Sequence, residues 1–234
     1  MEQMPYSEAC STAEIAAVER RPSNVDITTS DWQQKLPVLA GDGVILRELR
    51  LSDAPTLLMM LTIEEVTRFI SPPPTSVEGF ERFIRWTHEK RAAGQYVCLG
   101  VVPDGYDTAI GIFQVQLIDR QAGTAEWGFV IGSPFWGSGL FQKGAELTMR
   151  LAFEVLGVGR LEARSAVANV RGNAALRKLG AVREGVLPGS LLRNGVYLDQ
   201  NVWTILEEEY DLRQAPDGVD VATRRVIPPK VIRH

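Results

Sequence analysis

The sequence predicts an α/β (α+β) fold, in which a mixed, mostly antiparallel central sheet of about seven strands is flanked by about four helices. Two observations support this prediction. Three runs of alternating apolar residues follow one another within residues 96–131, separated only by short turns, which is typical of consecutive antiparallel strands. A strand, a glycine turn, a helix and a further strand then succeed one another over residues 124–167, and such a unit places its two strands parallel.

Two helices are expected before the three central strands. Regular alternation begins with a first strand at residues 44–49, and Pro72-Pro-Pro74 separates the two helices that follow it. Each helix carries start or stop signals, which are a side-chain cap before the first turn and a glycine after the last turn. These signals are Ser52 for a helix over residues 53–61, and Thr75, Glu78 and Gly94 for a helix over residues 75–93.

The remaining elements follow from the same periodicities. Residues 103–107 form turns at hairpin spacing, and Gly123 precedes the third strand. A helix that ends near Val155 follows this strand, and Asn173 is expected to cap a short helix that ends at Gly180. The expected strands are 96–102, 109–117, 124–131, 161–167, 181–186 and 196–205.

The turn Trp136-Gly-Ser-Gly139 connects the third of these strands to the helix. Gly137 and Gly139 have no Cβ, so the backbone can adopt positive φ and an anion can approach it closely. The first amides of a helix lack intrahelical partners and lie at the positive end of its dipole. The turn is therefore a candidate phosphate site, although an ordinary turn has the same pattern.

Periodic segments fill residues 39–210, which are expected to form one domain. Residues 1–38 mix Ser, Thr, Glu and Pro, with a short helix expected over residues 12–20, and are interpreted as an N-terminal extension. Residues 211–234 are interpreted as a polar C-terminal tail.

Composition argues against several functional classes. A net charge of −4 gives no electrostatic footprint for a nucleic-acid backbone, so direct nucleic-acid binding is not expected. The histidines, His88 and His234, and the distant cysteines, Cys10 and Cys98, offer little material for a metal site or a catalytic triad, so no metal is expected. Free thiols and the lack of an apolar run of ~20 residues indicate a cytoplasmic protein without a membrane partner.

Three separated blocks carry a resemblance to a known family. They are the strand with Glu126 and the turn Trp136-Gly-Ser-Gly139, then Asn169, and then the segment 176–185. Their order and spacing resemble the Gcn5-related N-acetyltransferase (GNAT) superfamily and, within it, the branch of the RimJ/RimL-type ribosomal-protein N-acetyltransferases. The resemblance spans about residues 44–207 and implies a cleft between a splayed fourth and fifth strand, in which acetyl-CoA binds as cosubstrate.

The resemblance also implies which residues contact the cosubstrate. The edge of the fourth strand would bind the pantetheine, main-chain amides of the glycine turn would bind the pyrophosphate, and side chains after the fifth strand would complete the site. These groups are Phe129, Val130 and Ile131; Trp136, Gly137, Ser138, Gly139, Leu140, Phe141 and Gln142; and Asn169, Asn173 and Arg177. Asn169 is alternatively a cap of the loop, and Arg177 alternatively lies on a solvated helix face.

Four positions depart from the family pattern. Phe141 stands where a small residue is usual, so its ring must point into the core or over the cosubstrate. Lys143 replaces a usual Glu, and Gly172 replaces a small hydroxyl residue. Leu176 stands where many members have a Tyr that protonates the departing CoA thiolate, so the motif assigns no general acid.

Acetyl transfer requires a neutral amine, whereas a primary amine with a pKa of about 10 is protonated at neutral pH. Glu126 is the candidate general base, acting directly or through water, and a solvated or salt-bridged strand carboxylate is the competing interpretation. A main-chain amide of its strand would polarise the thioester carbonyl. The expected reaction is direct attack without an acyl-enzyme.

The expected acceptor is a primary amine, either a protein N-terminus or a small molecule. The candidate walls of its site are Phe69, Trp86, Tyr197 and Trp203, for which core packing is an equal explanation. Two other functions stay open, a non-catalytic CoA-binding or regulatory module and a transferase for another acyl group such as succinyl. A homodimer is also left open.

Overall fold

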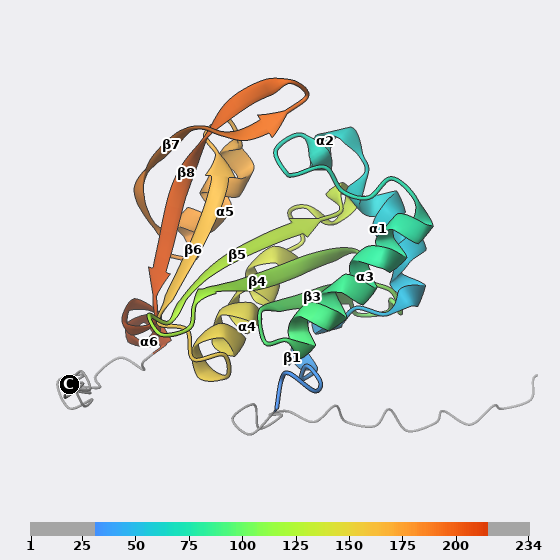
Figure 1. The fold of residues 1–234 in the computed structure, drawn as a ribbon, viewed down its shortest axis with the longest axis horizontal. Helices are drawn as coiled ribbons and strands as arrows, with labels where there is room; N and C mark the ends of the chain where they lie inside the picture. The colour runs from blue at the N-terminus through green and yellow to red at the C-terminus, as the bar shows by residue number, and fades with distance from the viewer. Residues whose placement is uncertain (1–30, 215–234) are drawn as a thin grey trace, which may run out of the picture.

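The computed structural model describes residues 31–214, which form one open eight-stranded sheet with helices on both faces (Figure 1). The strand order is β1-β2-β3-β4-β5-β6-β8-β7, and all neighbours are antiparallel except the parallel pair β5 and β6. The strands are β1 (Leu39–Gly41), β2 (Val44–Glu48), β3 (Tyr96–Pro103), β4 (Gly111–Asp119), β5 (Thr124–Ile131), β6 (Arg160–Ala166), β7 (Val182–Arg193) and β8 (Val196–Leu206). The helices are α1 (Ala54–Leu61), α2 (Glu64–Thr67), α3 (Val77–Ala92), α4 (Leu140–Glu154), α5 (Val170–Lys178) and α6 (Glu207–Gln214), with 3₁₀ turns η2 (Leu51–Asp53) and η3 (Ser133–Phe135).

The predicted fold class is confirmed, with small differences in the number of elements. The described residues contain eight strands rather than about seven and six α-helices rather than about four. The added elements are β1, α2 and α6, of which β1 and α2 have three and four residues, too short for a period to be read from sequence. The helix predicted over residues 12–20, Cys10 and the tail beyond residue 214 lie outside the described residues.

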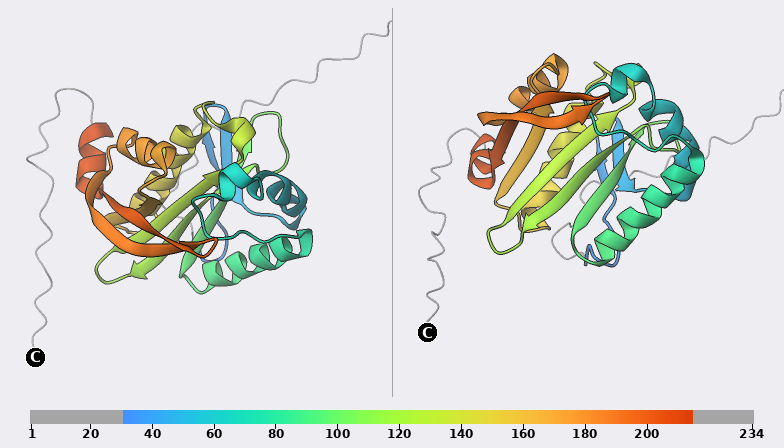
Figure 2. Two further views of the ribbon diagram at one scale, coloured as in Figure 1. Left: turned by 90° about the horizontal axis from the view of Figure 1, so that it is seen from above. Right: turned by 45° about the horizontal axis from the view of Figure 1, so that its top comes forward.

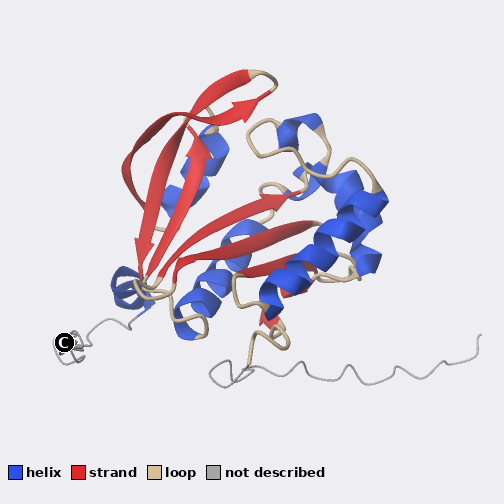
Figure 3. Ribbon diagram, in the orientation of Figure 1, coloured by secondary structure: helices blue, strands red, loops and turns tan. Residues whose placement is uncertain are grey.

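The sheet separates two apolar cores. Successive side chains of a strand point to opposite faces, so Leu99 and Val101 of β3 pack with α4, whereas Cys98 and Val102 pack with α1 and α3. Figure 3 shows α3 in front of the sheet and α4 behind it. Each face of the central strands is therefore covered by a helix.

Two predicted helix caps are wrong by one residue. Ser76, rather than Thr75, has an extended backbone before α3, and its hydroxyl accepts from the Gly79 amide at 3.1 Å. Ser52 lies within η2, and Asp53 is the residue that precedes α1. Adjacent polar residues offer equivalent caps in sequence, and the path of the chain decides which of them is used.

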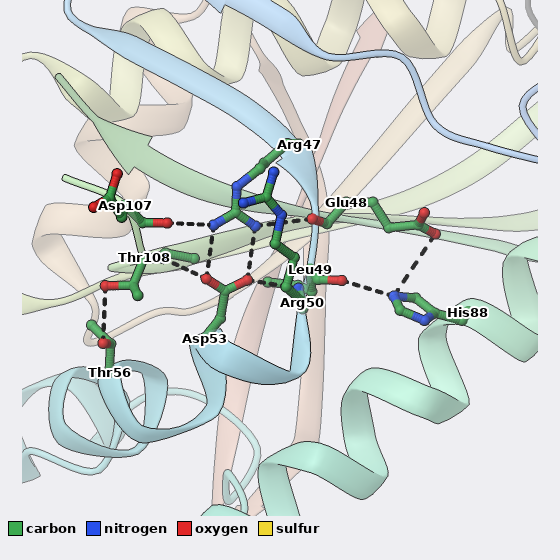
Figure 4. A network of polar contacts seen from close by, with 10 residues as sticks. Arg47, Glu48, Leu49, Arg50, Asp53, Thr56, His88, Asp107 and Thr108 are labelled. Carbon is green, nitrogen blue, oxygen red and sulfur yellow. Dashed lines mark hydrogen bonds and ion pairs between the residues drawn. The ribbon is translucent and has the colours of Figure 1, made fainter. Parts of the chain in front are cut away.

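A buried ion pair fixes the start of α1 against the sheet (Figure 4). Asp53 is fully buried, and its carboxylate accepts two hydrogen bonds from Arg47, both at 2.8 Å. It also accepts from the amides of Arg50 at 2.7 Å and Ala109 at 3.0 Å. Burial raises the pKa of Asp53, but the bonds from Arg47 and the two amides outweigh burial and hold that pKa below its usual value. The network joins β2, α1 and the loop before β4.

The C-terminal hairpin is longer than predicted and reaches α2. β7 continues to Arg193, whereas the predicted strand ended at residue 186. The prediction stopped early because a break in register between Leu187 and Leu191 interrupts the alternation of the sequence. Arg193 Nε donates to the carbonyl of Thr67 in α2 at 2.9 Å. Figure 2 shows the hairpin curving towards α2.

The predicted polar tail begins with a helix. α6 crosses the expected domain boundary at residue 210, and the ring of Tyr210 lies 5.2 Å from that of Phe153 on α4. Three consecutive glutamates at the start of α6 hide this apolar contact in the sequence.

Candidate active site

The parallel strands β5 and β6 diverge after three residue pairs. Thr124, Ala125 and Glu126 pair with Arg160, Leu161 and Glu162, and no further pairing joins the two strands. Figure 3 shows the two strands separating towards their carboxyl ends. A splayed pair leaves backbone groups without strand partners, and a ligand can satisfy such groups.

Alternate residues of β5 face this opening. The Gly132 amide donates to Ile110 at 3.0 Å on the β4 side, and the Val130 carbonyl lies against Gly111 of β4. Because backbone groups alternate along a strand, those of Trp127, Phe129 and Ile131 face β6 instead. The backbone of Val130 is therefore directed away from the opening, in contrast to the sequence-based assignment.

The glycine turn opens α4 with amide donors that no group in the described part of the chain uses. Gly137 and Gly139 have φ of 81° and 86°, and neither has a neighbour within 4 Å of where a Cβ would lie. The glycines are needed for their backbone conformation rather than for lack of space. Gly139 is the N-cap and provides no side-chain cap, and the amides of Phe141 and Gln142 have no acceptor among the described residues. This arrangement suits a phosphate.

The side chains of the turn mostly bind protein groups. The Ser138 hydroxyl donates to the Phe135 carbonyl at 2.7 Å, and Leu140 is buried. Gln142 Nε2 contacts Glu146 on the helix surface at 3.2 Å. These predicted residues therefore offer main-chain amides rather than side chains to a ligand.

The two unusual residues of the turn point away from it. The Phe141 ring packs at 4.5 Å from Phe129 and 6.0 Å from Phe113, within the core. Lys143 pairs with Asp42 in the β1–β2 turn, with Nζ and Oδ2 separated by 2.5 Å, and this pairing lowers the pKa of Asp42. Neither side chain obstructs the open amides.

Trp136 and Arg171 bridge the mouth of the opening. The Trp136 indole donates to the Ile131 carbonyl at 2.8 Å, and the Arg171 guanidinium lies 4.2 Å from the centre of the Trp136 ring. Trp136 follows β5 and Arg171 lies in the first turn of α5, so this cation–π contact joins the segments that follow the two diverging strands. Arg171 was not predicted, because nothing in the sequence distinguishes it from other basic residues of exposed helix faces.

Protein groups accept from the Val170, Gly172 and Asn173 amides at the start of α5. Asn169, not Asn173, is its N-cap, and Asn169 Oδ1 accepts from the Gly172 amide at 2.9 Å. Asn173 lies one turn inside the helix, and its Nδ2 donates to the carbonyls of Ala166 and Asn169 at 2.9 and 2.8 Å. Its Oδ1 accepts from Asn201 and from the Trp203 indole, both at 2.9 Å.

Trp203 is a core residue rather than a wall of an open acceptor site. It is 3% exposed and lies on the face of β8 that carries α5. A cavity of about 650 Å³ between α5 and β8 is bordered by Asn173, Arg177 and Trp203. Arg177 is exposed and lies 5.9 Å from the Trp203 ring, apart from the edge of β5.

The other three predicted walls come from α3, the segment after α2 and the C-terminal hairpin. Trp86 on α3 is 41% exposed and contacts the Tyr96 ring edge-on at 5.0 Å. Phe69 follows α2 and is half-buried, and Tyr197 near the hairpin tip is exposed. The contact of Arg193 with Thr67 brings the hairpin and α2 together.

Glu126 lies where the two strands begin to diverge. Its side chain is 37% exposed and lies on the α3 face, with Oε2 3.6 Å from Arg164 Nε. Gln116 on β4 and Glu162 on β6 are its cross-strand neighbours. Burial raises the pKa of the nearby Tyr96 phenol, which stays protonated and donates to Gln114 at 2.5 Å. These polar neighbours could not be predicted from the sequence, because they lie on other strands and only strand pairing brings them next to Glu126.

Residues 31–214 contain no group of three or more His, Cys, Asp or Glu side chains arranged to hold a metal ion. None of the helices in this part of the chain combines the length and apolar character needed to cross a membrane.

Comparison with known proteins identifies the family. Residues 44–182 match the acetyltransferase (GNAT) domain. The chain is 26% identical over 176 residues to the uncharacterized N-acetyltransferase p20 of Bacillus licheniformis, across 75% of this chain and 99% of that protein. Ribosomal-protein-S5-alanine acetyltransferase from Vibrio fischeri has a similar fold, with a TM-score of 0.68 and 18% identity over 74% of this chain and 98% of that chain. Mycobacterium smegmatis RimJ, solved with CoA-disulfide, has a TM-score of 0.66 and 19% identity over 71% and 83% of the two chains. The chain therefore belongs to the GNAT acetyltransferase family and is an acyltransferase.

Proposed function

We propose that this protein transfers the acetyl group of acetyl-CoA to a primary amine by direct attack. The observation that supports this most strongly is the opening between β5 and β6, next to the uncapped start of α4. The RimJ structure with CoA-disulfide is consistent with a CoA ligand in a protein of this fold. Acetyl-CoA would supply the activated acyl group.

Backbone groups would hold the cosubstrate. The free amides at the start of α4 suit a pyrophosphate, because the helix dipole adds to their hydrogen bonds. The backbone groups of Trp127 and Phe129 face the opening and suit the amides of a pantetheine. We leave Val130 and Asn173 out of this set, because their relevant polar groups already contact protein.

Glu126 would take a proton from the attacking amine, directly or through water. A carboxylate that is 37% exposed is accessible to an amine or to a bridging water, and the ion pair with Arg164 at 3.6 Å is exposed and therefore weak. The competing interpretation as a salt-bridged strand carboxylate rests on the same contact. The turnover of Glu126→Gln separates the two interpretations.

The acceptor would enter over the front of the sheet. Trp86, Phe69 and Tyr197 come from α3, the segment after α2 and the C-terminal hairpin, and the hairpin contact with α2 would limit the size of the entrance. We keep protein N-termini and small amines as the two classes of acceptor.

The test measures thiol release from acetyl-CoA with a panel of peptides and small amines, together with the affinity for CoA. We expect release only with a suitable amine, and Glu126→Gln should lower turnover about 100-fold or more while CoA affinity stays within about threefold. CoA binding without thiol release across the panel would favour the non-catalytic module, for which the buried Leu176 is the supporting observation. A product mass other than acetyl would favour another acyl group.

A further inference from the structure

Ser165 on β6 carries a hydroxyl that no group in residues 31–214 satisfies. The residue is 6% exposed, and its Oγ is buried without a hydrogen-bond partner among the described residues. Buried hydroxyls normally find a partner, because leaving one unpaired costs free energy. The protein therefore maintains an available donor at this position.

Ser165 lies beside the opening between the strands. It is three residues beyond Glu162, the last residue of β6 that pairs with β5. It pairs with Asn201 of β8 and belongs to the face of the sheet that α5 covers. A Cβ on Gly172, in the first turn of α5, would lie 3.1 Å from Ser165 Oγ. Glycine at this position therefore leaves room for the Ser165 hydroxyl.

The strand segments that border the opening and the first turn of α5 contain no other hydroxyl. Residues 127–131 of β5 and 163–166 of β6 include only one such side chain, and the first turn of α5 includes none. Leu176, farther along α5, is apolar and 1% exposed. Within these segments, Ser165 therefore carries the one side-chain O–H that can assist the departure of a thiolate.

We propose that Ser165 donates a hydrogen bond to the sulfur of acetyl-CoA as the bond between carbon and sulfur breaks. The proposal rests on the proposed function, because it requires the thioester to lie where β5 and β6 diverge. A donor aimed at the atom on which charge develops lowers the barrier, as the donors of an oxyanion hole do. Ser165 is then a catalytic residue of this chain.

The step is balanced without an additional reactant. The amine nitrogen bonds to the acetyl carbon and gives one proton to Glu126 or water, and the electron pair of the C–S bond leaves with sulfur. Ser165 keeps its own proton, because an alcohol is a much weaker acid than a thiol with a pKa of about 8.5. The thiolate gains a proton from water after it leaves, and Glu126 returns its proton to water.

The first test compares Ser165→Ala with Ser52→Ala, which changes an exposed serine in η2. Ser165→Ala should lower kcat about 10- to 100-fold, somewhat less than the loss of an oxyanion donor because sulfur is a weak acceptor. CoA affinity should stay within about threefold, and Ser52→Ala should match the wild type. Full turnover by Ser165→Ala would overturn the proposal.

The second test measures proximity without turnover. Ser165→Cys and Ser52→Cys, in a background with Cys10→Ser, are treated with CoA disulfide or glutathione disulfide; the thiolate attacks the disulfide, and one thiol leaves. The buried Cys98 is inert, because burial raises its thiol pKa. Ser165→Cys should react at least about tenfold faster with CoA disulfide than with glutathione disulfide, which mass spectrometry would show as a CoA adduct.

These outcomes separate the two proposals. Equal rates with the two disulfides at position 165, in a protein that binds CoA and turns over, would overturn the role of Ser165 alone. A wild-type protein that neither binds CoA nor releases thiol would overturn the proposed function and this inference with it.

Discussion

Two helices begin on opposite sides of the opening, and they differ in whether protein groups accept hydrogen bonds from the amides of the first turn. α4 begins at Gly139, which has no side chain to cap the amides of Phe141 and Gln142. α5 begins at Asn169, whose carboxamide accepts from the Gly172 amide at 2.9 Å. Both helices follow a strand of the same parallel pair, so position alone does not make a ligand site. The helix start that the protein leaves open is the one suited to an anion.

Protein groups also use the polar side chain of Asn173, one turn inside α5. Asn173 joins α5 to the end of β6 and to two residues of β8 through the hydrogen bonds of one carboxamide. We therefore interpret Asn173 as a structural residue and the start of α4 as the binding element. Three substitutions test this division.

Replacing Asn173 should have the largest effect. Asn173→Ala leaves Asn201 and the Trp203 indole without their buried acceptor, and we expect the free energy of unfolding to fall by about 3 kcal/mol. Urea unfolding measures this change. A loss below about 1 kcal/mol would contradict a structural role for Asn173.

Adding a charge to the open helix start should have the next largest effect. Gly139→Asp places a carboxylate beside the free amides, where it would repel the pyrophosphate. We expect the free energy of CoA binding to weaken by about 2 kcal/mol, which corresponds to about 30-fold lower affinity. Gly139→Asn is the matched control, because Asn tolerates the φ of 86° without adding charge. Isothermal titration calorimetry compares the two variants, and equal affinities would place the pyrophosphate elsewhere.

Removing the cap of α5 should have the smallest effect. Asn169→Ala should lower the free energy of unfolding by about 1 kcal/mol, because the Gly172 amide loses its acceptor. Asn169→Asp keeps an acceptor at this position and should restore most of that stability in thermal unfolding. If Asn169→Ala instead weakens CoA binding more than Gly139→Asp does, the division between the two helices is wrong.

Local signals in the sequence were sufficient for most of the fold. Apart from the four-residue α2, the strand and helix periods predicted the order of elements from β2 to β8, and the glycines with positive φ marked the turn before α4 and the end of α3. Family membership followed from the same blocks and is confirmed by the match over residues 44–182. These features depend on residues that are close in the chain.

Features that depend on strand pairing could not be predicted in this way. The order of the strands decides that Trp203 points into the core and that the backbone of Val130 faces β4. The curvature of the hairpin brings Arg193 to Thr67. The N-cap of α5 was misplaced because Asn169 and Asn173 are equivalent as sequence signals. The unpaired Ser165 hydroxyl is likewise recognisable only once its neighbours are known.

The most direct test of the account is amide-resolved hydrogen exchange with and without CoA. We expect CoA to slow exchange at Phe129 on the β5 edge and at the amides of Phe141 and Gln142, which have no acceptor among the described residues. The amides of Gly172 and Asn173, which already bind Asn169, should change much less. Slowed exchange confined to the start of α5, with no change at the start of α4, would contradict the proposed CoA site.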